Sequence, residues 1–144
     1  MIPMKGLQLT EGNPFPVQTV DWFPSPPHPQ SPLMPVLKNH RTRPDEIAPG
    51  VFRKVIHLDG LMTAIIDFTN GPWTEPEPRH THPHEQSSYV AKGELMVFIG
   101  DEEHRLEEGD VFTVPSNVPH TVQILSPEVR LVDSFQPIRK DFLK

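Results

Sequence analysis

The chain contains no cysteine among its 144 residues, so neither a disulfide framework nor a thiolate metal site can form. It has no apolar run long enough to span a membrane, and its N-terminus, which includes Pro3 and Lys5, lacks the apolar core of a signal peptide. We therefore expect a soluble protein of the reducing cytoplasm that has no membrane partner.

An excess of basic residues is absent as well. Lys and Arg number 13 against 19 Asp and Glu, which gives a formal net charge of -6. Nucleic-acid-binding domains cluster positive charge, so this balance of scattered Lys and Arg argues against a nucleic acid partner. The negative charge also opposes long-range attraction of acidic ligands, so an anionic ligand would need a local cation.

Proline, in contrast, is abundant: the chain has 19, and eleven of them lie within residues 1–50. Residues 13–35 cannot form a helix or a central strand because so many positions lack an N–H donor. Apolar side chains in this segment favour an ordered arm over a disordered tail; they are Phe15, Val17, Trp22, Phe23, Leu33 and Met34. The sequence thus predicts a proline-rich N-terminal arm over 1–49, packed either on its own barrel or on a partner subunit, and one barrel domain over 50–144.

Short runs of β-prone residues separated by turn signals fill the rest of the chain. They predict strands over 51–58, 61–68, 79–82, 87–91, 94–99, 103–106, 110–114, 120–125 and 129–135. Such regular spacing is typical of an all-β sandwich or barrel. Residues 94–99 are apolar on both parities, so one face meets the core and the other meets the arm or a second subunit. We expect a homodimer.

A candidate metal site lies at the centre of the chain. His80 and His82 are two residues apart, so on an extended strand both imidazoles leave the same face, with Cα atoms about 7 Å apart. Gln86 follows as an uncharged oxygen donor, either as a ligand or as a partner of a metal-bound water. A proline-bounded turn after residues 110–114 delivers His120. Three imidazoles and an amide suit one borderline divalent ion: zinc, nickel, manganese, cobalt or iron.

His84 shares the parity of His80 and His82, but Pro83 interrupts the strand between them. We expect the His84 ring at the rim of the site or facing solvent.

The C-terminal strand contains a second anomaly. Its apolar face includes Asp133, and burying an unpaired carboxylate costs several kcal/mol. Arg139 is the nearest cation that can fold back towards it. Two interpretations stay open: an Asp133–Arg139 ion pair that caps the barrel, or a proton-transferring carboxylate beside the metal, with Arg139 binding a substrate carboxylate bidentately.

Motif order and spacing resemble the cupin family, whose members are double-stranded β-helix (jelly-roll) barrels with an internal metal. The matching pattern is Gly71, HxHxxxQ over 80–86, Gly93, fifteen residues, and then G-x5-P-x-N-x2-H from Gly109 to His120. Gln86 stands where most cupins carry glutamate, Asn117 where the second motif usually has glycine, and Ile124 where asparagine often follows. Asn117 is a mild change because asparagine tolerates left-handed turns.

The C-terminal D-x-F-x-x-x-R pattern is similar to the KdgF-type cupins of pectin and alginate breakdown. The resemblance implies that His80, His82, Gln86 and His120 are metal ligands and that Asp133, Phe135 and Arg139 are catalytic. The implied reaction converts 4,5-unsaturated uronates into linear ketonised sugar acids, with one divalent metal ion as cofactor and an anionic sugar acid as substrate. Two alternatives stay open: a cupin dioxygenase with a three-histidine iron site, and a non-catalytic module that binds a metal or a sugar acid.

Overall fold

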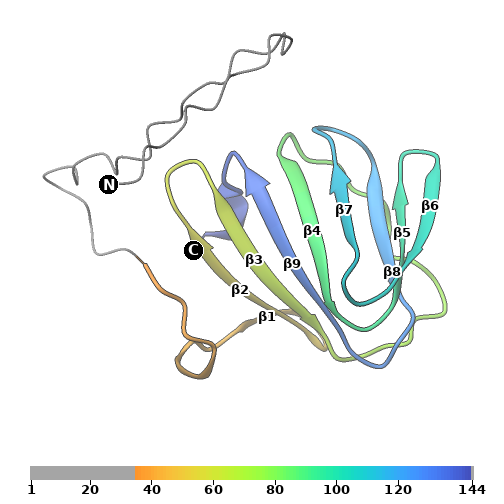
Figure 1. Ribbon diagram of the computed structural model, residues 1–144, viewed down its shortest axis with the longest axis horizontal. Helices are drawn as coiled ribbons and strands as arrows, with labels where there is room; N and C mark the ends of the chain where they lie inside the picture. Colours follow the sequence, from red (N-terminus) through yellow and green to blue (C-terminus); the bar gives the residue numbers. More distant parts are fainter. Residues whose placement is uncertain (1–34, 144) are drawn as a thin grey trace, which may run out of the picture. The chain divides into compact units, whose positions relative to one another are not determined.

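The computed structural model describes residues 35–143, which form nine strands and two short 3-10 turns. The strands are β1 (Asp45–Ala48), β2 (Val51–His57), β3 (Met62–Phe68), β4 (Glu85–Lys92), β5 (Leu95–Ile99), β6 (Glu102–Leu106), β7 (Val111–Val114), β8 (His120–Ile124) and β9 (Val129–Gln136), and the turns are η1 (Asn39–Arg41) and η2 (Lys140–Phe142) (Figure 1). The predicted all-β class is confirmed. The arm was predicted over 1–49; its residues 1–34, which include the apolar anchors, lie outside the described residues, and its residues 35–49 include η1 and β1.

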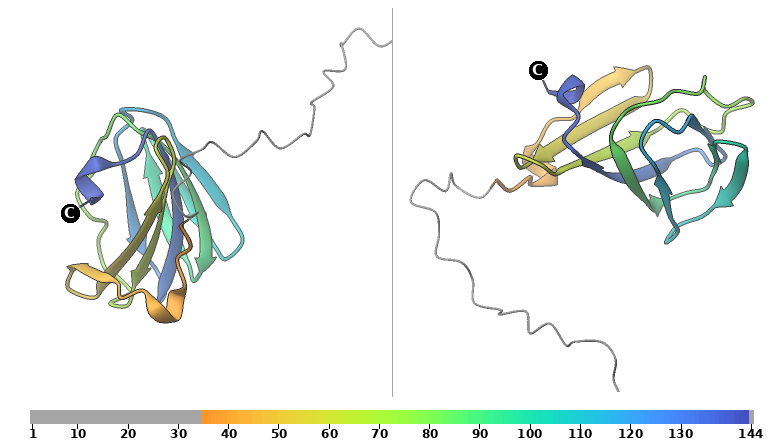
Figure 2. Two further views of the ribbon diagram at one scale, coloured as in Figure 1. Left: turned by 90° about the vertical axis from the view of Figure 1, so that its left-hand side faces the viewer. Right: turned by 90° about the horizontal axis from the view of Figure 1, so that it is seen from above.

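Two antiparallel sheets build the barrel. One has the order β1-β2-β3-β9-β4-β7 and the other β6-β5-β8. Strand β9 pairs with both β3 and β4, so the last strand of the chain lies at the centre of the larger sheet. Figure 2 shows the two sheets curving around a shared interior, with the C-terminal turn at one end. Inward-facing side chains of β4, β8 and β9 are therefore brought together.

Side-chain parity follows the predicted alternation. In β9, Val129, Leu131, Asp133 and Phe135 are buried, whereas the residues between them face outwards and are only partly buried. Strand β4 alternates in the same way and buries Gln86, Ser88 and Val90. The inward parity predicted for Asp133 is confirmed.

The apolar interior divides into two clusters. The larger contains Val90, Leu95, Val97, Ile124 and Leu131 among its members. The smaller consists of Met62, Ala64 and Phe135, with partly buried Val55, Ile66, Ile138 and Phe142 packed against it. A group of buried polar residues belongs to neither cluster: His82, Gln86, Ser88, His120, Thr121 and Asp133. Burying this many polar groups is costly unless they are bonded or serve a site.

The strand predicted over 79–82 is wrong. His80 forms only an isolated bridge with His120, and its neighbours are irregular. Pro76, Pro78 and Pro83 have no N–H to donate, so a continuous ladder cannot form here.

Strand β1 was not expected, because the pattern indicated strands only from residue 51. It is four residues long, lies between Pro44 and Pro49, and pairs with β2 at the edge of the larger sheet. Its short, mostly exposed sequence carries no alternation that could reveal it.

Met96 and Phe98, whose side chains lie on the outward face of β5, are half-buried. The guanidinium carbon of Arg79 lies 5.9 Å from the Phe98 ring centroid. The homodimer expected from this two-sided strand stays a prediction. Among the described residues, no helix is long and apolar enough to cross a membrane.

Candidate metal centre

Three histidines converge inside the barrel. One ligand atom from each of His80, His82 and His120 lies within 4.8 Å of the other two. The ring centroid of His120 is 4.3 Å from that of His80 and 4.7 Å from that of His82. His82 and His120 are buried and His80 is exposed, so the group has one open side. The predicted three-histidine group is thus formed without the predicted strand.

Backbone contacts between the two motifs hold these histidines in place. His80 and His120 exchange two N–H···O bonds of 3.0 Å. The N–H of Asn117 donates to the carbonyl of His82 at 2.8 Å, and the Ser116 hydroxyl donates to the carbonyl of Pro83 at 2.7 Å. Asn117 has a φ of 61°, the left-handed conformation that glycine or asparagine accepts most readily. The replacement of glycine by Asn117 therefore preserves the turn.

Glycine is required at Gly71 and Gly93 because neighbouring backbone approaches closely. A Cβ added at Gly71 would lie 2.0 Å from the carbonyl oxygen of Ser126, and one at Gly93, whose φ is +82°, would lie 2.2 Å from that of Glu128. These two motif glycines allow the chain to pack against the 126–128 turn.

Hydrogen bonds leave the Nε2 atoms of two rings available as ligands. His82 Nδ1 is 3.0 Å from the carbonyl oxygen of His84, and His120 Nδ1 is 2.8 Å from that of Val118. A carbonyl can only accept, so each Nδ1 carries the proton and each Nε2 has a free lone pair. Within residues 35–143, the buried Nε2 of His120 has no hydrogen-bond partner.

Gln86 completes the donor set. Its Nε2 donates to Ser88 Oγ at 2.9 Å, which turns its Oε1 towards His82 Nε2 at 3.1 Å. Two lone-pair atoms at this distance repel unless a cation or a proton lies between them. The unpartnered His120 nitrogen and this close N···O approach both fit a divalent ion with three imidazole ligands and one amide.

The histidines are held neutral. Burial, followed by the charges of His120, His82 and Arg139, lowers the pKa of His80 to about 4. Burial is also the first cause of the lowered pKa values of His82 and His120. Neutral imidazoles are the form that binds metal, so the site is prepared for an ion at physiological pH.

Asp133 is connected to this donor set through Ser88. The two residues face each other in the β4–β9 register, and the Ser88 side chain hydrogen-bonds the carboxyl group. Burial raises the pKa of Asp133 to about 6, while the Ser88 hydrogen bond and the charge of Arg139 act in the opposite direction. Asp133 Oδ1 is buried without a hydrogen-bond partner among the described residues.

One cavity of about 360 Å³ brings most of the predicted residues together. His80, Gln86 and His120 line it beside Asp133, Phe135 and Arg139. His82 is not among the lining residues; its ring centroid lies 5.8 Å from that of Phe135. The structure therefore places predicted metal ligands and the three tail residues around one space.

The predicted Asp133–Arg139 ion pair is not formed. Arg139 pairs with Asp141 instead, with Nη2 at 2.8 Å from Oδ2 and Nε at 3.4 Å from Oδ1. Asp141 is close in sequence, in the η2 turn, whereas Asp133 is buried against Ser88. The capping ion pair is thus excluded as the reason for a buried Asp133.

Three residues near the site were missed from the sequence. Arg53 and Phe142 line the cavity, and Ser88 bonds Asp133. In β2, Arg53 is a charged residue between Val51 and Val55 on the inward-facing side of the strand. Asp133 is a charged residue at an equivalent kind of position in β9, so the same sequence signal was present for Arg53. His84 is half-buried and contributes its carbonyl oxygen, not its ring, to the three-histidine group.

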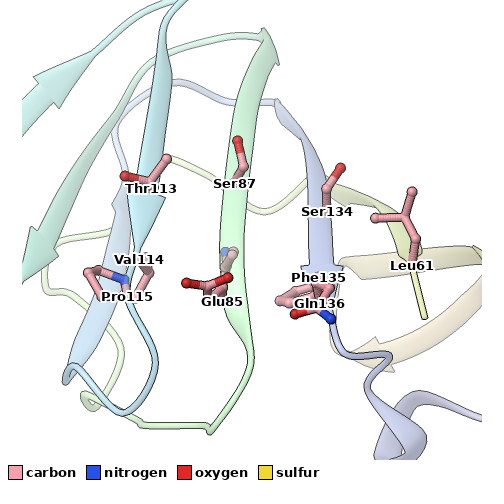
Figure 3. A pocket seen from close by; sticks show the side chains of 10 residues that line it. Leu61, Glu85, Ser87, Thr113, Val114, Pro115, Ser134, Phe135 and Gln136 are labelled. Atoms are coloured by element: carbon pink, nitrogen blue, oxygen red, sulfur yellow. The ribbon is translucent and has the colours of Figure 1, made fainter. Parts of the chain in front are cut away.

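A second hollow lies on the outer face of the larger sheet. Figure 3 shows the hydroxyl-bearing side chains of Thr113, Ser87 and Ser134 side by side there, and the strand register pairs Ser87 with both of the others. Gln86 borders this hollow, but its amide bonds inward to His82 and Ser88. Glu85 is the titratable residue that lines this hollow, whereas His80, His120, Asp133 and Arg139 line the inner cavity.

Relatives of the chain agree with this geometry. Residues 69–134 match the cupin domain family. The chain is 37% identical over 101 residues to the pectin degradation protein KdgF of Dickeya dadantii, an alignment that covers 69% of this chain and 89% of that protein. The chain belongs to the cupin family. The cupin resemblance and its KdgF-type character, both expected from the motifs, are confirmed.

Solved structures of other cupins have the same architecture. KdgF from a Halomonas species has a TM-score of 0.70 at 31% sequence identity, with 77% of this chain and 100% of that chain covered. An RmlC-like cupin from Shewanella frigidimarina has a TM-score of 0.66 at 33% identity, covering 74% and 94%. The jelly-roll barrel predicted for this cupin is confirmed.

Proposed function

We propose that this cupin is a metal-dependent tautomerase that converts 4,5-unsaturated uronates into linear ketonised sugar acids in pectin breakdown. The observation that carries the proposal is the single cavity in which ligands of a three-histidine, one-amide site meet Asp133 and Arg139. The identity to a pectin degradation protein supports the substrate class.

His80, His82, His120 and Gln86 are the residues that would hold the ion. Bound there by four neutral ligands, a divalent ion supplies Lewis-acid polarisation of a carboxylate or carbonyl oxygen of the sugar acid.

Asp133 is the proton carrier in this proposal. Linearisation first breaks the bond between C1 and the ring oxygen: the anomeric hydroxyl loses its proton as the aldehyde forms, and the released oxygen on C5 gains one to become an enol. The enol then loses its hydroxyl proton and gains one on C4, so the net reaction is an isomerisation that needs no other reactant. The Asp133 carboxylate accepts the enol hydroxyl proton and returns it to C4. A carboxyl group whose pKa is raised to about 6 is well matched to both transfers near neutral pH.

Arg139 binds the substrate carboxylate, and Phe135 forms an apolar wall. The guanidinium carbon of Arg139 lies 5.3 Å from the Phe135 ring centroid and 4.1 Å from that of Phe142. These ring contacts fix the guanidinium at the cavity, where it meets the requirement for a local cation in an acidic protein.

The test is turnover of unsaturated galacturonate by metal-loaded protein under argon, followed by loss of the ultraviolet absorbance of the conjugated double bond. The proposal expects this loss without oxygen. A three-histidine group also suits the iron of a dioxygenase, for which turnover would need oxygen and would consume it. A protein that binds metal but changes neither absorbance nor oxygen would be a non-catalytic module, and the proposal would be wrong.

A further inference from the structure

Two arginines from distant parts of the chain meet at the cavity. Arg53 comes from β2 and Arg139 follows β9, and both line the cavity beside His80 and Asp133. Their guanidinium carbons lie 3.9 Å and 4.1 Å from the centroid of one ring, that of Phe142 in the η2 turn. Phe142 therefore fixes the position of both cations.

One edge of the Arg139 guanidinium is already hydrogen-bonded to Asp141. Asp141 accepts from its Nε and Nη2, so a ligand oxygen would meet Arg139 chiefly at Nη1. A carboxylate has two oxygens, and strong recognition engages both with paired N–H donors. A second donor is needed in the same cavity.

Arg53 is suited to be that donor. Within the part of the chain that the structure describes, its Nε is buried without a hydrogen-bond partner, although the nearby Asp45 stabilises its charge. Burying an N–H donor of a charged group without a partner is costly, so its retention calls for an acceptor that is absent from the protein itself.

The electrostatics of the cavity point to an anion. Burial is the largest cause of the lowered pKa of Arg53; the charge of Arg139 lowers this pKa as well, whereas the charges of Asp45 and Asp141 raise it. Two positive groups held near one another repel, and an anionic ligand between them would remove that repulsion.

We propose that Arg53 and Arg139 form a two-guanidinium site, fixed by Phe142, that binds the carboxylate of the ligand. The identity of that ligand as a uronate rests on the function proposed above, but carboxylate binding by Arg53 does not require turnover. Arg53 is thus a specificity residue that selects acidic sugars over neutral ones.

Binding of D-galacturonate and D-galactose to metal-loaded protein, measured by calorimetry, tests the proposal. Arg53→Gln removes the cation and is expected to weaken galacturonate binding by about tenfold or more, with little change for galactose. The matched control is Lys54→Gln, which removes the same charge one residue along β2, where Lys54 donates to the carbonyl of Asn39 outside the cavity. Lys54→Gln is expected to bind galacturonate as the wild-type protein does.

A second variant separates carboxylate binding from packing on Phe142. Arg53→Lys keeps the positive charge but loses the paired N–H donors of the guanidinium, so its affinity for galacturonate is expected to lie between those of wild type and Arg53→Gln. If Arg53→Gln fails to fold, Arg53→Lys is measured in its place. Unchanged galacturonate affinity in a folded Arg53 variant, or an equal loss in Lys54→Gln, would overturn the proposal. If galacturonate binding depends on Arg53 but no uronate is turned over, the two-guanidinium site stands and the proposed function fails.

Discussion

Ser88 lies directly opposite Asp133 in the β4–β9 register, and both side chains are buried. Ser88 accepts a hydrogen bond from Gln86 and hydrogen-bonds Asp133, so one hydroxyl connects a proposed metal ligand to the proposed proton carrier. The orientation of the Gln86 amide and the ionisation of Asp133 are therefore coupled.

Ser88→Ala tests this coupling. The Ser88 hydrogen bond lowers the pKa of Asp133, so its loss raises that pKa further, and the base form is reached only at higher pH. The acid limb of the pH profile of kcat/KM is expected to move to higher pH, with about tenfold less activity near pH 6. An unshifted limb in a metal-loaded Ser88→Ala protein would exclude the coupling. Ser87→Ala, whose side chain faces outwards on the same strand, is the control.

His82→Ala is expected to remove most of the bound metal. The wild-type protein should hold about one divalent ion per chain, because three neutral imidazoles and an amide form one site. Plasma mass spectrometry of untagged protein measures the content. His57→Ala, at an exposed position of β2, should retain the metal. Full occupancy in a His80→Ala, His82→Ala double variant would contradict the assigned ligands.

Much of this site could be predicted because its signals are local. The spacing of His80, His82 and Gln86 is short, and strand alternation reveals Asp133 as a charge on an apolar face. Arg53 carried the same parity signal, but only the fold places β2 beside the cavity. The partner of Arg139 could not be predicted, because Asp133 and Asp141 are both close in sequence and the η2 turn decides between them. Strand β1 and the irregular 79–82 segment were not predicted, because they depend on proline positions and on pairing at a sheet edge. The alternation of apolar and polar residues carries no information about either.

The stability of the metal-free protein should depend on pH through Asp133. Its pKa in the folded state is about 6, above the ordinary value of 3.8, so the folded state holds the proton more tightly than the unfolded state does. The contribution of Asp133 to the free energy of unfolding therefore falls as pH rises from about 4 to about 6, by up to about 3 kcal/mol, and stays lower above that range. His80, whose pKa burial lowers to about 4, contributes in the opposite direction over the same range, so the Asp133 contribution is measured as the difference between wild type and Asp133→Asn.

The amide introduced by Asp133→Asn cannot ionise, so this variant should not lose stability between pH 4 and 6 in the way that wild type does through Asp133. In EDTA-treated protein, chemical denaturation at pH 7.5 is expected to show the variant as more stable than wild type, with the difference vanishing near pH 4. Asp101→Asn at an exposed position is the control and should show no such gain. An Asp133→Asn protein that is less stable than wild type at pH 7.5 would mean that the carboxylate is paired and contributes to the fold.

The central claim is that Asp133 moves a proton in a cavity that also holds the metal. The most direct measurement is turnover of unsaturated galacturonate by Asp133→Asn protein with verified metal content and a wild-type melting curve. The amide keeps the shape and hydrogen bonding of the side chain but cannot accept the proton, so kcat is expected to fall by about 10²-fold or more while metal content stays the same. Undiminished turnover in that folded, metal-loaded variant would contradict the proposed role of Asp133.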